Sequence, residues 1–261
     1  MTQDARLQQT PLAQDLRDQL QKLVALNEEQ LRLSRLAALG PDRVLHFTHL
    51  GEDVRLHVPF GDRDYIQRHI LASGSFYEIR ALEQVRQMGV VPAGKMICDL
   101  GANIGNHAVY FGMFLGASRI FAVEPQRACH RILERNIELN DIAAETHRVM
   151  LGEEDGQGEI DVYKARNIGG TSFRASETGG VPMRRLDGLL AGRAAEVGFM
   201  KIDVEGFQMP LLRGAAEVLE EARPALWIEL FRDDVAEATD FLKPFGYRAE
   251  RLNRDNYVFA V

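Results

Sequence analysis

The sequence is short of the residues that would place it in several protein classes. It has only two cysteines in 261 residues, Cys98 and Cys129, and their spacing fits neither a zinc site nor a redox pair. No apolar run approaches the roughly 18 residues of a membrane span, and no secretory signal opens the chain. We therefore expect reduced thiols, no metal site, no membrane span and a cytoplasmic protein.

Positive charge is also scarce. The chain carries 31 Lys and Arg against 38 Asp and Glu, which gives a formal net charge of −7. That balance argues against a general nucleic-acid-binding protein. Apolar residues make up 46% of the chain, so we expect a globular protein with one substantial core.

The sequence also lacks the Gly-x-Gly-x-x-Gly spacing of dinucleotide-binding proteins. In its place, a buried apolar strand (96–100) leads into Gly101-Ala102-Asn103-Ile104-Gly105, and an apolar helix (106–115) follows. Such glycines allow positive φ and close approach of a ligand, and the helix start offers free N–H groups. Glu124 ends the next apolar run, where a carboxylate can bind ribose hydroxyls. The pattern predicts a site for an adenosine-containing cofactor.

Further segments extend this pattern, and together they resemble the FkbM family of S-adenosylmethionine (SAM) methyltransferases. They are Glu124-Pro125-Gln126, then Asn136 with Asn140, then Lys201-Ile202-Asp203-Val204-Glu205-Gly206-Phe207. The resemblance covers roughly residues 60–230. It implies a SAM cofactor and O-methylation, often of sugars or polyketide-type products.

Strands and helices alternate regularly from Lys95 onwards, which predicts a mostly parallel sheet with helices on both faces. We expect the strands at 96–100, 119–124, 146–151, 199–204 and 225–230. The turn at 253–256 is too short for a parallel return, so the last two strands must form an antiparallel hairpin. The fold class is therefore a Rossmann-like class I methyltransferase sheet with an N-terminal helical extension.

The chain divides into three predicted parts. Residues 1–40 form a helix (3–39) with leucines at three- and four-residue steps. This helix either packs on its own domain or mediates homodimerisation or the docking of a partner. Residues 41–92 hold a hairpin and two cap helices (62–71 and 76–88), and residues 93–261 form the SAM-binding core.

The expected cofactor contacts lie at strand ends and in the cap segment. In folds of this type the segment before the first strand closes over the methionine end of the cofactor, which adds Tyr77 and Glu78. The alternative is that Glu78 only offsets the dipole of its helix. The full set is Asp99, Gly101, Ala102, Asn103, Gly105, Asn106, Glu124, Pro125, Leu151, Tyr77 and Glu78.

The expected catalytic residues are Lys201, Asp203 and Glu205, which alternate through a strand end and so share one side. Asp203 or Glu205 is the candidate general base, and Lys201 tunes both carboxylates. The alternative is a buried ion-pair cluster that braces the strand. The Asn-Pro-Pro-Tyr motif of base-modifying methyltransferases is absent, which leaves a hydroxyl as the better acceptor.

An insertion at 153–185 interrupts the alternation and carries five basic residues, including Arg174. It is either a solvated basic face or a loop for an anionic acceptor. Glu229, Thr171 and Arg174 are the candidate acceptor contacts. The predicted function is SAM-dependent O-methylation of a sugar, glycan or polyketide-type hydroxyl. The alternatives are an NAD-dependent oxidoreductase and a non-catalytic SAM-binding interaction subunit.

Overall fold

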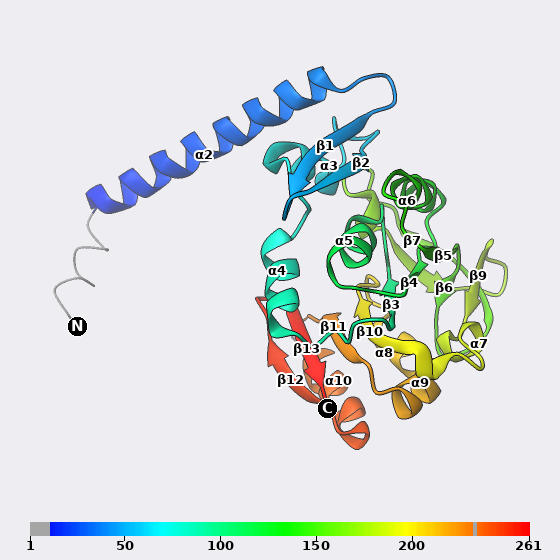
Figure 1. Ribbon diagram of the computed structural model, residues 1–261. Coiled ribbons are helices and arrows are strands. Elements are labelled where there is room, and N and C mark those ends of the chain that lie inside the picture. The colour runs from blue at the N-terminus through cyan, green and yellow to red at the C-terminus, as the bar shows by residue number, and fades with distance from the viewer. Residues whose placement is uncertain (1–10, 232–233) are drawn as a thin grey trace.

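The computed structural model describes residues 11–231 and 234–261, and a seven-stranded sheet lies at its centre (Figure 1). All neighbouring strands pair in parallel except β13, which is antiparallel to both its neighbours. The predicted class I methyltransferase sheet and its terminal hairpin are therefore confirmed. The strand order is β12 (Arg248–Arg251), β13 (Asn256–Ala260), β11 (Ala225–Glu229), β10 (Val197–Ile202), β3 (Met96–Leu100), β4 (Arg119–Val123) and β5 (Ala144–His147).

Helices cover both faces of this sheet, because its strands are apolar on both sides. All five residues of β3 are buried. The consecutive residues Ile97 and Cys98 belong to two different apolar clusters, one on each face of the sheet. The first cluster packs under α4 (Ile79–Met88), α5 (Asn106–Phe114) and α6 (Arg127–Leu139). The second packs under α8 (Gln208–Arg213), α9 (Ala216–Glu221) and α10 (Asp234–Leu242).

The strand order reverses at β3, which lies between β4 and β10. In open α/β sheets the crevice at such a point, beyond the carboxyl ends of the strands, is where ligands bind. Here the loops after β3 and β10 touch: a Cβ on Gly101 would lie 1.8 Å from the carbonyl oxygen of Asp203. Gly101 also has φ +87°, so only glycine fits this position.

The cap segment packs into the first apolar cluster. The predicted hairpin is present as β1 (Val44–His49) and β2 (Glu52–His57) and is followed by α3 (Tyr65–Ser73). The next helix, α4, starts three residues later than predicted, since Glu78 has φ 55° and cannot continue a right-handed helix. Phe76, which stands before this break, is 1% exposed in the shared core.

The insertion forms a second sheet, and the prediction of strand 146–151 was wrong here. The chain leaves the main sheet after β5, and β6 (Met150–Leu151) pairs instead with β9 (Val181–Arg184). The sheet order is β6-β9-β7-β8, with β7 at Gly156–Val162 and β8 at Ser172–Ala175. β8 becomes a strand by pairing antiparallel with β7.

The helical segment between β10 and β11 is broken into α8 and α9. A Cβ on Gly214 would lie 2.0 Å from the carbonyl oxygen of Gly152, so this position packs directly against the loop that follows β6. The short elements are η1 (Ile168–Gly170), α7 (Leu186–Leu189), η2 (Ala194–Glu196) and η3 (Lys243–Phe245).

Helix α2 (Pro11–Ala38) projects away from the body of the molecule (Figure 1). Its last turns are fixed to the cap, where Arg32 donates to the Gly61 carbonyl (3.0 Å) and Arg35 to the Leu71 carbonyl (2.7 Å). Residues 3–10 of the predicted helix lie outside the described residues. Among those that are described, no helix combines the length and apolarity needed to cross a membrane.

Candidate active site

A cavity opens at the carboxyl ends of β3, β4, β10 and β11. Eleven predicted site residues line it: Tyr77, Glu78, Gly101, Asn103, Glu124, Pro125, Leu151, Thr171, Asp203, Glu205 and Glu229. Six predicted residues are outside the lining: Asp99, Ala102, Gly105, Asn106, Lys201 and Arg174.

Two of the outlying residues belong to the glycine turn and hold its shape. The Ala102 N–H donates to the Val123 carbonyl (2.9 Å) and is not directed at the cavity. A Cβ on Gly105 would lie 2.7 Å from the side chain of Leu133 in α6. Gly105 therefore permits helix packing, and the close approach of a ligand that we expected at both glycines is open only at Gly101.

Asn106 does not line the cavity, but it holds a residue that does. Its side chain accepts from the Tyr77 N–H (2.9 Å) and donates to the Tyr77 carbonyl (3.1 Å). It thereby fixes the cap segment that brings Tyr77 to the lining. Asn136 plays a similar part, since it accepts from the His57 N–H (2.6 Å) and donates to the Ile104 carbonyl (2.8 Å).

Glu124 follows β4, and its carboxylate is held by backbone groups. One oxygen accepts from the Asn103 N–H (2.9 Å) and the other from the Gln126 N–H (2.7 Å). Burial raises the pKa of Glu124 to about 7, against the lowering effect of these two hydrogen bonds. Each carboxylate oxygen has a second lone pair, so Glu124 can still accept from a ligand.

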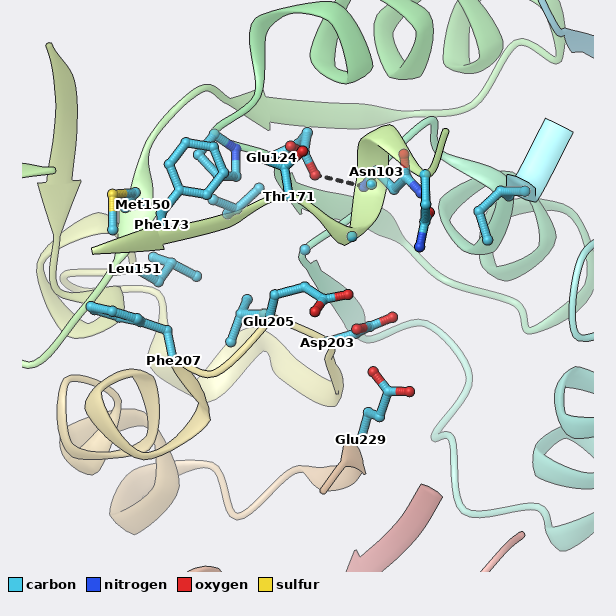
Figure 2. Close-up of a pocket in the computed structure, with 18 of the residues that line it drawn as sticks. Asn103, Glu124, Met150, Leu151, Thr171, Phe173, Asp203, Glu205, Phe207 and Glu229 are labelled. Carbon is cyan, nitrogen blue, oxygen red and sulfur yellow. Dashed lines mark hydrogen bonds between the residues drawn. The ribbon is translucent and has the colours of Figure 1, made fainter. Parts of the chain in front are cut away.

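One side of the cavity is apolar. Pro125, Met150, Leu151, Phe173 and Phe207 line it, and we call these five residues the apolar half. Figure 2 shows Phe173 and Phe207 on either side of Met150 and Leu151, with Glu124 at one end. Such walls suit a flat aromatic ring that is bound mainly by burial.

Away from the apolar half, Figure 2 shows Asp203, Glu205 and Glu229, which follow β10 or end β11. Glu78 of the cap segment also lines the cavity, and we call these four carboxylates the acidic half. Among the described residues that line the cavity, none is Lys, Arg or His. The nearest cation is Lys201, 2% exposed in the sheet, whose Nζ lies 2.9 Å from Asp203 Oδ2. Lys201 therefore neutralises Asp203 from within the sheet and does not line the cavity.

The four acids differ in protonation. Burial and the neighbouring Asp203 raise the pKa of Glu229 to about 9, so Glu229 is protonated at neutral pH and can donate to Asp203. Burial acts on Asp203 to raise its pKa, but the charge of Lys201 and the hydrogen bonds from Glu229 and Lys201 together outweigh burial and hold the pKa of Asp203 below its usual range. Burial raises the pKa of Glu205, opposed by Lys164 at 3.4 Å. Asp203 and Glu229 thus behave as a pair, and Glu205 is the separate carboxylate.

Glu78 is placed by a strained backbone. A non-glycine residue at φ 55° is uncommon, and such positions gather at functional sites. Its carboxylate lies 3.4 Å from His107 Nε2. Burial raises the pKa of Glu78, but His107 and the charge of Lys201 together outweigh burial, and the net shift of the pKa is downward. Glu78 is therefore an ionised member of the acidic half, more than a residue that offsets the dipole of its helix.

Arg174 lies away from the cavity. Its side chain is 63% exposed and forms an ion pair with Glu159 at 2.7 Å. Asp99 is fully buried in β3 beneath the cavity. Neither residue is therefore placed to contact a ligand directly, in contrast to the sequence-based expectation.

Residues 167–173 of the insertion contribute to the cavity lining, and we call this segment the roof. Asp64 holds the roof in place. One Asp64 oxygen accepts from the Ile168 N–H in η1 (2.9 Å), and the other caps α3 at the Gln67 N–H (3.1 Å). The Tyr65 N–H also donates to the Arg166 carbonyl (2.8 Å). Segments about 100 residues apart in the sequence are therefore joined above the site.

Sequence reasoning missed several lining residues, among them Tyr65, Ile66, Asn167, Gly169 and Gly170. Phe207 is the last residue of the Lys201–Phe207 motif, and Met150 lies near the end of the predicted strand 146–151, so the sequence could have indicated both. Tyr65 and Asn167 carried none, because the contacts that bring them to the cavity join distant segments.

The comparisons with known proteins decide what kind of domain this is. The sequence model described as the Methyltransferase FkbM domain matches residues 99–249. The chain belongs to the FkbM methyltransferase family. The matched region begins at Asp99 and contains Glu124, Asp203, Glu205 and Glu229.

Similar proteins include two curated fungal methyltransferases. Methyltransferase sdnD of Sordaria araneosa is 26% identical over 162 residues, 49% of this chain and 62% of that protein, so less than two thirds of its length is matched. Methyltransferase 1 of Beauveria bassiana (strain ARSEF 2860) is 26% identical over 182 residues, 60% of this chain and 73% of that protein. Among solved structures, methyltransferase FkbM from Methylobacillus flagellatus KT is 17% identical with a TM-score of 0.48, covering 75% of this chain and 62% of that chain.

The cofactor of this FkbM domain is SAM, and the cavity fits it. Gly101 leaves bare backbone at the switch point, Glu124 can accept from ribose hydroxyls, and the apolar half suits an adenine ring. The acidic half suits the sulfonium and ammonium charges of SAM, since opposite charges attract strongly in a partly buried site. When bound, SAM supplies an electrophilic methyl group.

Proposed function

We propose that this protein is a SAM-dependent O-methyltransferase that acts on a hydroxyl of a sugar, glycan or polyketide-type small molecule. The observation that supports this best is the acidic half itself, a set of carboxylates beside the cofactor region. A hydroxyl must lose its proton as it is methylated, and carboxylates can accept it. The NAD-dependent alternative has no support, because the chain belongs to a methyltransferase family.

In this proposal Glu205 is the general base. Asp203 is occupied by Lys201 at 2.9 Å and receives a hydrogen bond from protonated Glu229. Glu205 has a raised pKa and lies apart from that pair, so it is the better proton acceptor. Asp203 then orients the acceptor hydroxyl, and Glu229 holds Asp203. Glu78 faces the same space and favours a cationic or neutral ligand group.

The lining favours an uncharged acceptor. The described lining residues offer no cationic side chain to an anionic group, and Arg174 is paired elsewhere. Tyr65 and Tyr77 stand at the edge of the cavity with ring centroids 6.3 Å apart. Such aromatic faces suit the apolar side of a sugar or polyketide ring.

An acceptor screen tests the function. Purified protein is incubated with SAM and matched compounds that carry a hydroxyl, an amine or a carboxylate at one position, and release of S-adenosylhomocysteine is measured. We expect turnover with hydroxyl compounds only. Turnover restricted to the amine or carboxylate series would overturn O-methylation. Binding of SAM with no turnover across the panel, and equal behaviour of Glu205→Gln, would favour the non-catalytic subunit.

We also propose that α2 joins two copies of the chain. Leu16, Leu20 and Leu23 are 56%, 63% and 63% exposed, although they form one stripe. At 3.6 residues per turn this stripe lies nearly opposite Arg32 and Leu36, the side that contacts the body. Its own domain therefore leaves the stripe uncovered.

A second copy is the fitting partner for this stripe. Leu20 and Asn27 are seven residues apart, as are Leu16 and Leu23, which is the spacing of a two-stranded coiled coil. A single Asn on such a seam specifies register and a defined number of strands. Two identical helices would thus cover each other's leucines.

Light scattering tests the assembly. Replacing Leu20 and Leu23 by Glu should convert a dimer to a monomer, while Gln14→Glu with Gln21→Glu adds the same charge on the other face and should leave the dimer intact. A monomeric native protein would refute the proposal.

The cytoplasm remains the proposed compartment, consistent with the buried free thiols of Cys98 and Cys129.

A further inference from the structure

Two consecutive residues of the cap are held by the first two residues of α5. Asn106 bonds both backbone groups of Tyr77, since its side chain accepts from the Tyr77 N–H (2.9 Å) and donates to the Tyr77 carbonyl (3.1 Å). His107, the next residue, brings its Nε2 atom to 3.4 Å from Oε2 of Glu78. We call these four residues the clamp. It joins the cap to the helix that begins directly after the glycine turn.

His107 is a buried histidine that the proposed mechanism does not use. It is 7% exposed, and its ring meets the Trp227 ring edge to face with centroids 5.4 Å apart. Its Nε2 atom is buried, forms no hydrogen bond with the described residues and has one acid within ion-pair distance among them, Glu78. A carboxylate can only accept, so Nε2 must carry a proton for this contact to be favourable. The core therefore fixes the ring, and the ring holds the Glu78 carboxylate.

The clamp accounts for the strained backbone of Glu78. This residue has φ 55° and ψ 30° and directly precedes α4, yet its carboxylate makes no capping hydrogen bond to that helix. Such strain persists only where the surrounding structure over-determines the conformation. Here Asn106 fixes the preceding peptide groups and His107 fixes the side chain. As a result the carboxylate lines the cavity instead of capping its own helix.

Glu78 also differs from the other carboxylates of the acidic half. Glu229 is protonated, and lysine Nζ atoms lie 2.9 Å and 3.4 Å from the carboxylates of Asp203 and Glu205. Glu78 is ionised, and among the described residues no lysine or arginine lies within ion-pair distance of it. An ionised carboxylate in a partly buried site attracts a cation strongly. SAM carries two cations, and its ammonium is the one that donates hydrogen bonds.

We propose that Glu78 binds the ammonium group at the amino-acid end of SAM, and that His107 is a positioning residue that holds the Glu78 carboxylate for this contact. The contact is a hydrogen bond between opposite charges, which is among the stronger kinds in proteins. The sequence analysis placed Tyr77 and Glu78 near this end of the cofactor but gave His107 no role. The proposal rests on SAM as the cofactor and not on which acceptor is methylated.

Calorimetry with two ligands tests the proposal. S-adenosylhomocysteine carries the ammonium, whereas 5′-deoxy-5′-methylthioadenosine has the same adenosine and sulfur but no amino-acid end. Glu78→Gln should weaken binding of S-adenosylhomocysteine about 10- to 100-fold, the effect of one hydrogen bond between charged groups. His107→Phe keeps a ring beside Trp227 but has no donor, and it should weaken the same ligand about 3- to 10-fold. Both variants should bind methylthioadenosine within about twofold of the native protein.

A combined variant shows whether His107 acts through Glu78. In the Glu78→Gln background, His107→Phe should cause little further loss, because the residue through which it acts is already changed. His107→Gln keeps an N–H donor and should recover most of the affinity for S-adenosylhomocysteine. Thermal unfolding shows whether each variant is folded, and His107→Leu takes the place of the phenylalanine variant if that one is not.

Three results would overturn the proposal. Equal weakening of both ligands in the phenylalanine or leucine variant would give His107 a general structural role. Native-like binding of S-adenosylhomocysteine by Glu78→Gln would remove the ammonium contact. Additive losses in the combined variant would separate His107 from Glu78. A lack of turnover in the acceptor screen bears on the proposed O-methylation alone, because these binding measurements use no acceptor.

Discussion

The apolar half and the acidic half of the cavity differ in the side chains that form them. The apolar half is made by Pro125, by Met150 and Leu151 of β6, by Phe173 of the insertion and by Phe207 in the loop after β10, and it binds by burial. The acidic half consists of Glu78, Asp203, Glu205 and Glu229, whose protonation states depend on one another. In the proposed function the apolar half holds the adenine ring of SAM, whereas the acidic half faces the charged end of SAM and supplies the proton acceptor. Substitutions in the two halves should therefore affect different measured quantities.

The largest effect is expected on turnover, from the acidic half. Glu205→Gln removes the proposed base and should lower the rate constant by about 10²–10⁴, because a neutral amide cannot accept the proton. Affinity for S-adenosylhomocysteine should stay nearly native. Steady-state rates and calorimetry on the same samples check both expectations, with Glu159→Gln outside the cavity as the charge-matched control.

The pH–rate profile separates Glu205 from Asp203. Asp203→Asn should also slow turnover but keep the acidic limb of the profile, whereas Glu205→Gln should lose it. Near-native turnover of Glu205→Gln would move the base to Asp203 or Glu229. Loss of cofactor binding in both variants would instead assign these carboxylates to the structural scaffold.

The second effect is on affinity, at the boundary of the apolar half. Glu124→Ala should weaken S-adenosylhomocysteine binding by about 1.5–3 kcal/mol, the range for a hydrogen bond to a charged group. Calorimetry measures it. An unchanged dissociation constant would remove the ribose assignment from Glu124.

The pH dependence of binding gives a sharper check on Glu124. Its pKa is raised to about 7, and the ionised carboxylate is the better acceptor for ribose hydroxyls. Native binding should therefore strengthen by up to about tenfold as the pH rises from 6 to 8, since the ionised fraction grows by that factor. Glu124→Gln should flatten this dependence.

The third effect is on stability, and it probes the carboxylate pair. The pKa of Glu229 is about 9 in the folded protein against an ordinary value of 4.5. Between these values the unfolded chain ionises while the folded protein holds its proton, so the contribution of Glu229 to stability falls as pH rises. Glu229→Gln removes this loss, and its unfolding midpoint should rise relative to the native protein from pH 5 to pH 9.

Urea or thermal unfolding at several pH values measures that trend. The exposed β12 residue Glu250 provides a control, because Glu250→Gln should follow the native protein throughout. A constant difference between Glu229→Gln and the native protein would show that Glu229 is ionised in the fold and that the two carboxylates are not coupled.

The sequence by itself determined the central sheet and one side of the site. The five-residue strand before Gly101, the glycine turn and the acid after the next strand are local patterns, and each fixes its own conformation. The positions of strand ends then follow from the α/β alternation, which is why Glu124, Asp203 and Glu229 were all found. The short turn at 253–256 likewise fixed the antiparallel hairpin.

Only the tertiary structure decided what depends on distant partners. β6 leaves the main sheet because β9 pairs with it, and the roof reaches the cavity because Asp64 binds Ile168 more than 100 residues away. The protonation of Glu229 comes from burial beside Asp203, and Arg174 is removed from the site by Glu159. Pairing, burial and charge coupling join residues that no local pattern connects, so the sequence could name these side chains but not assign their roles.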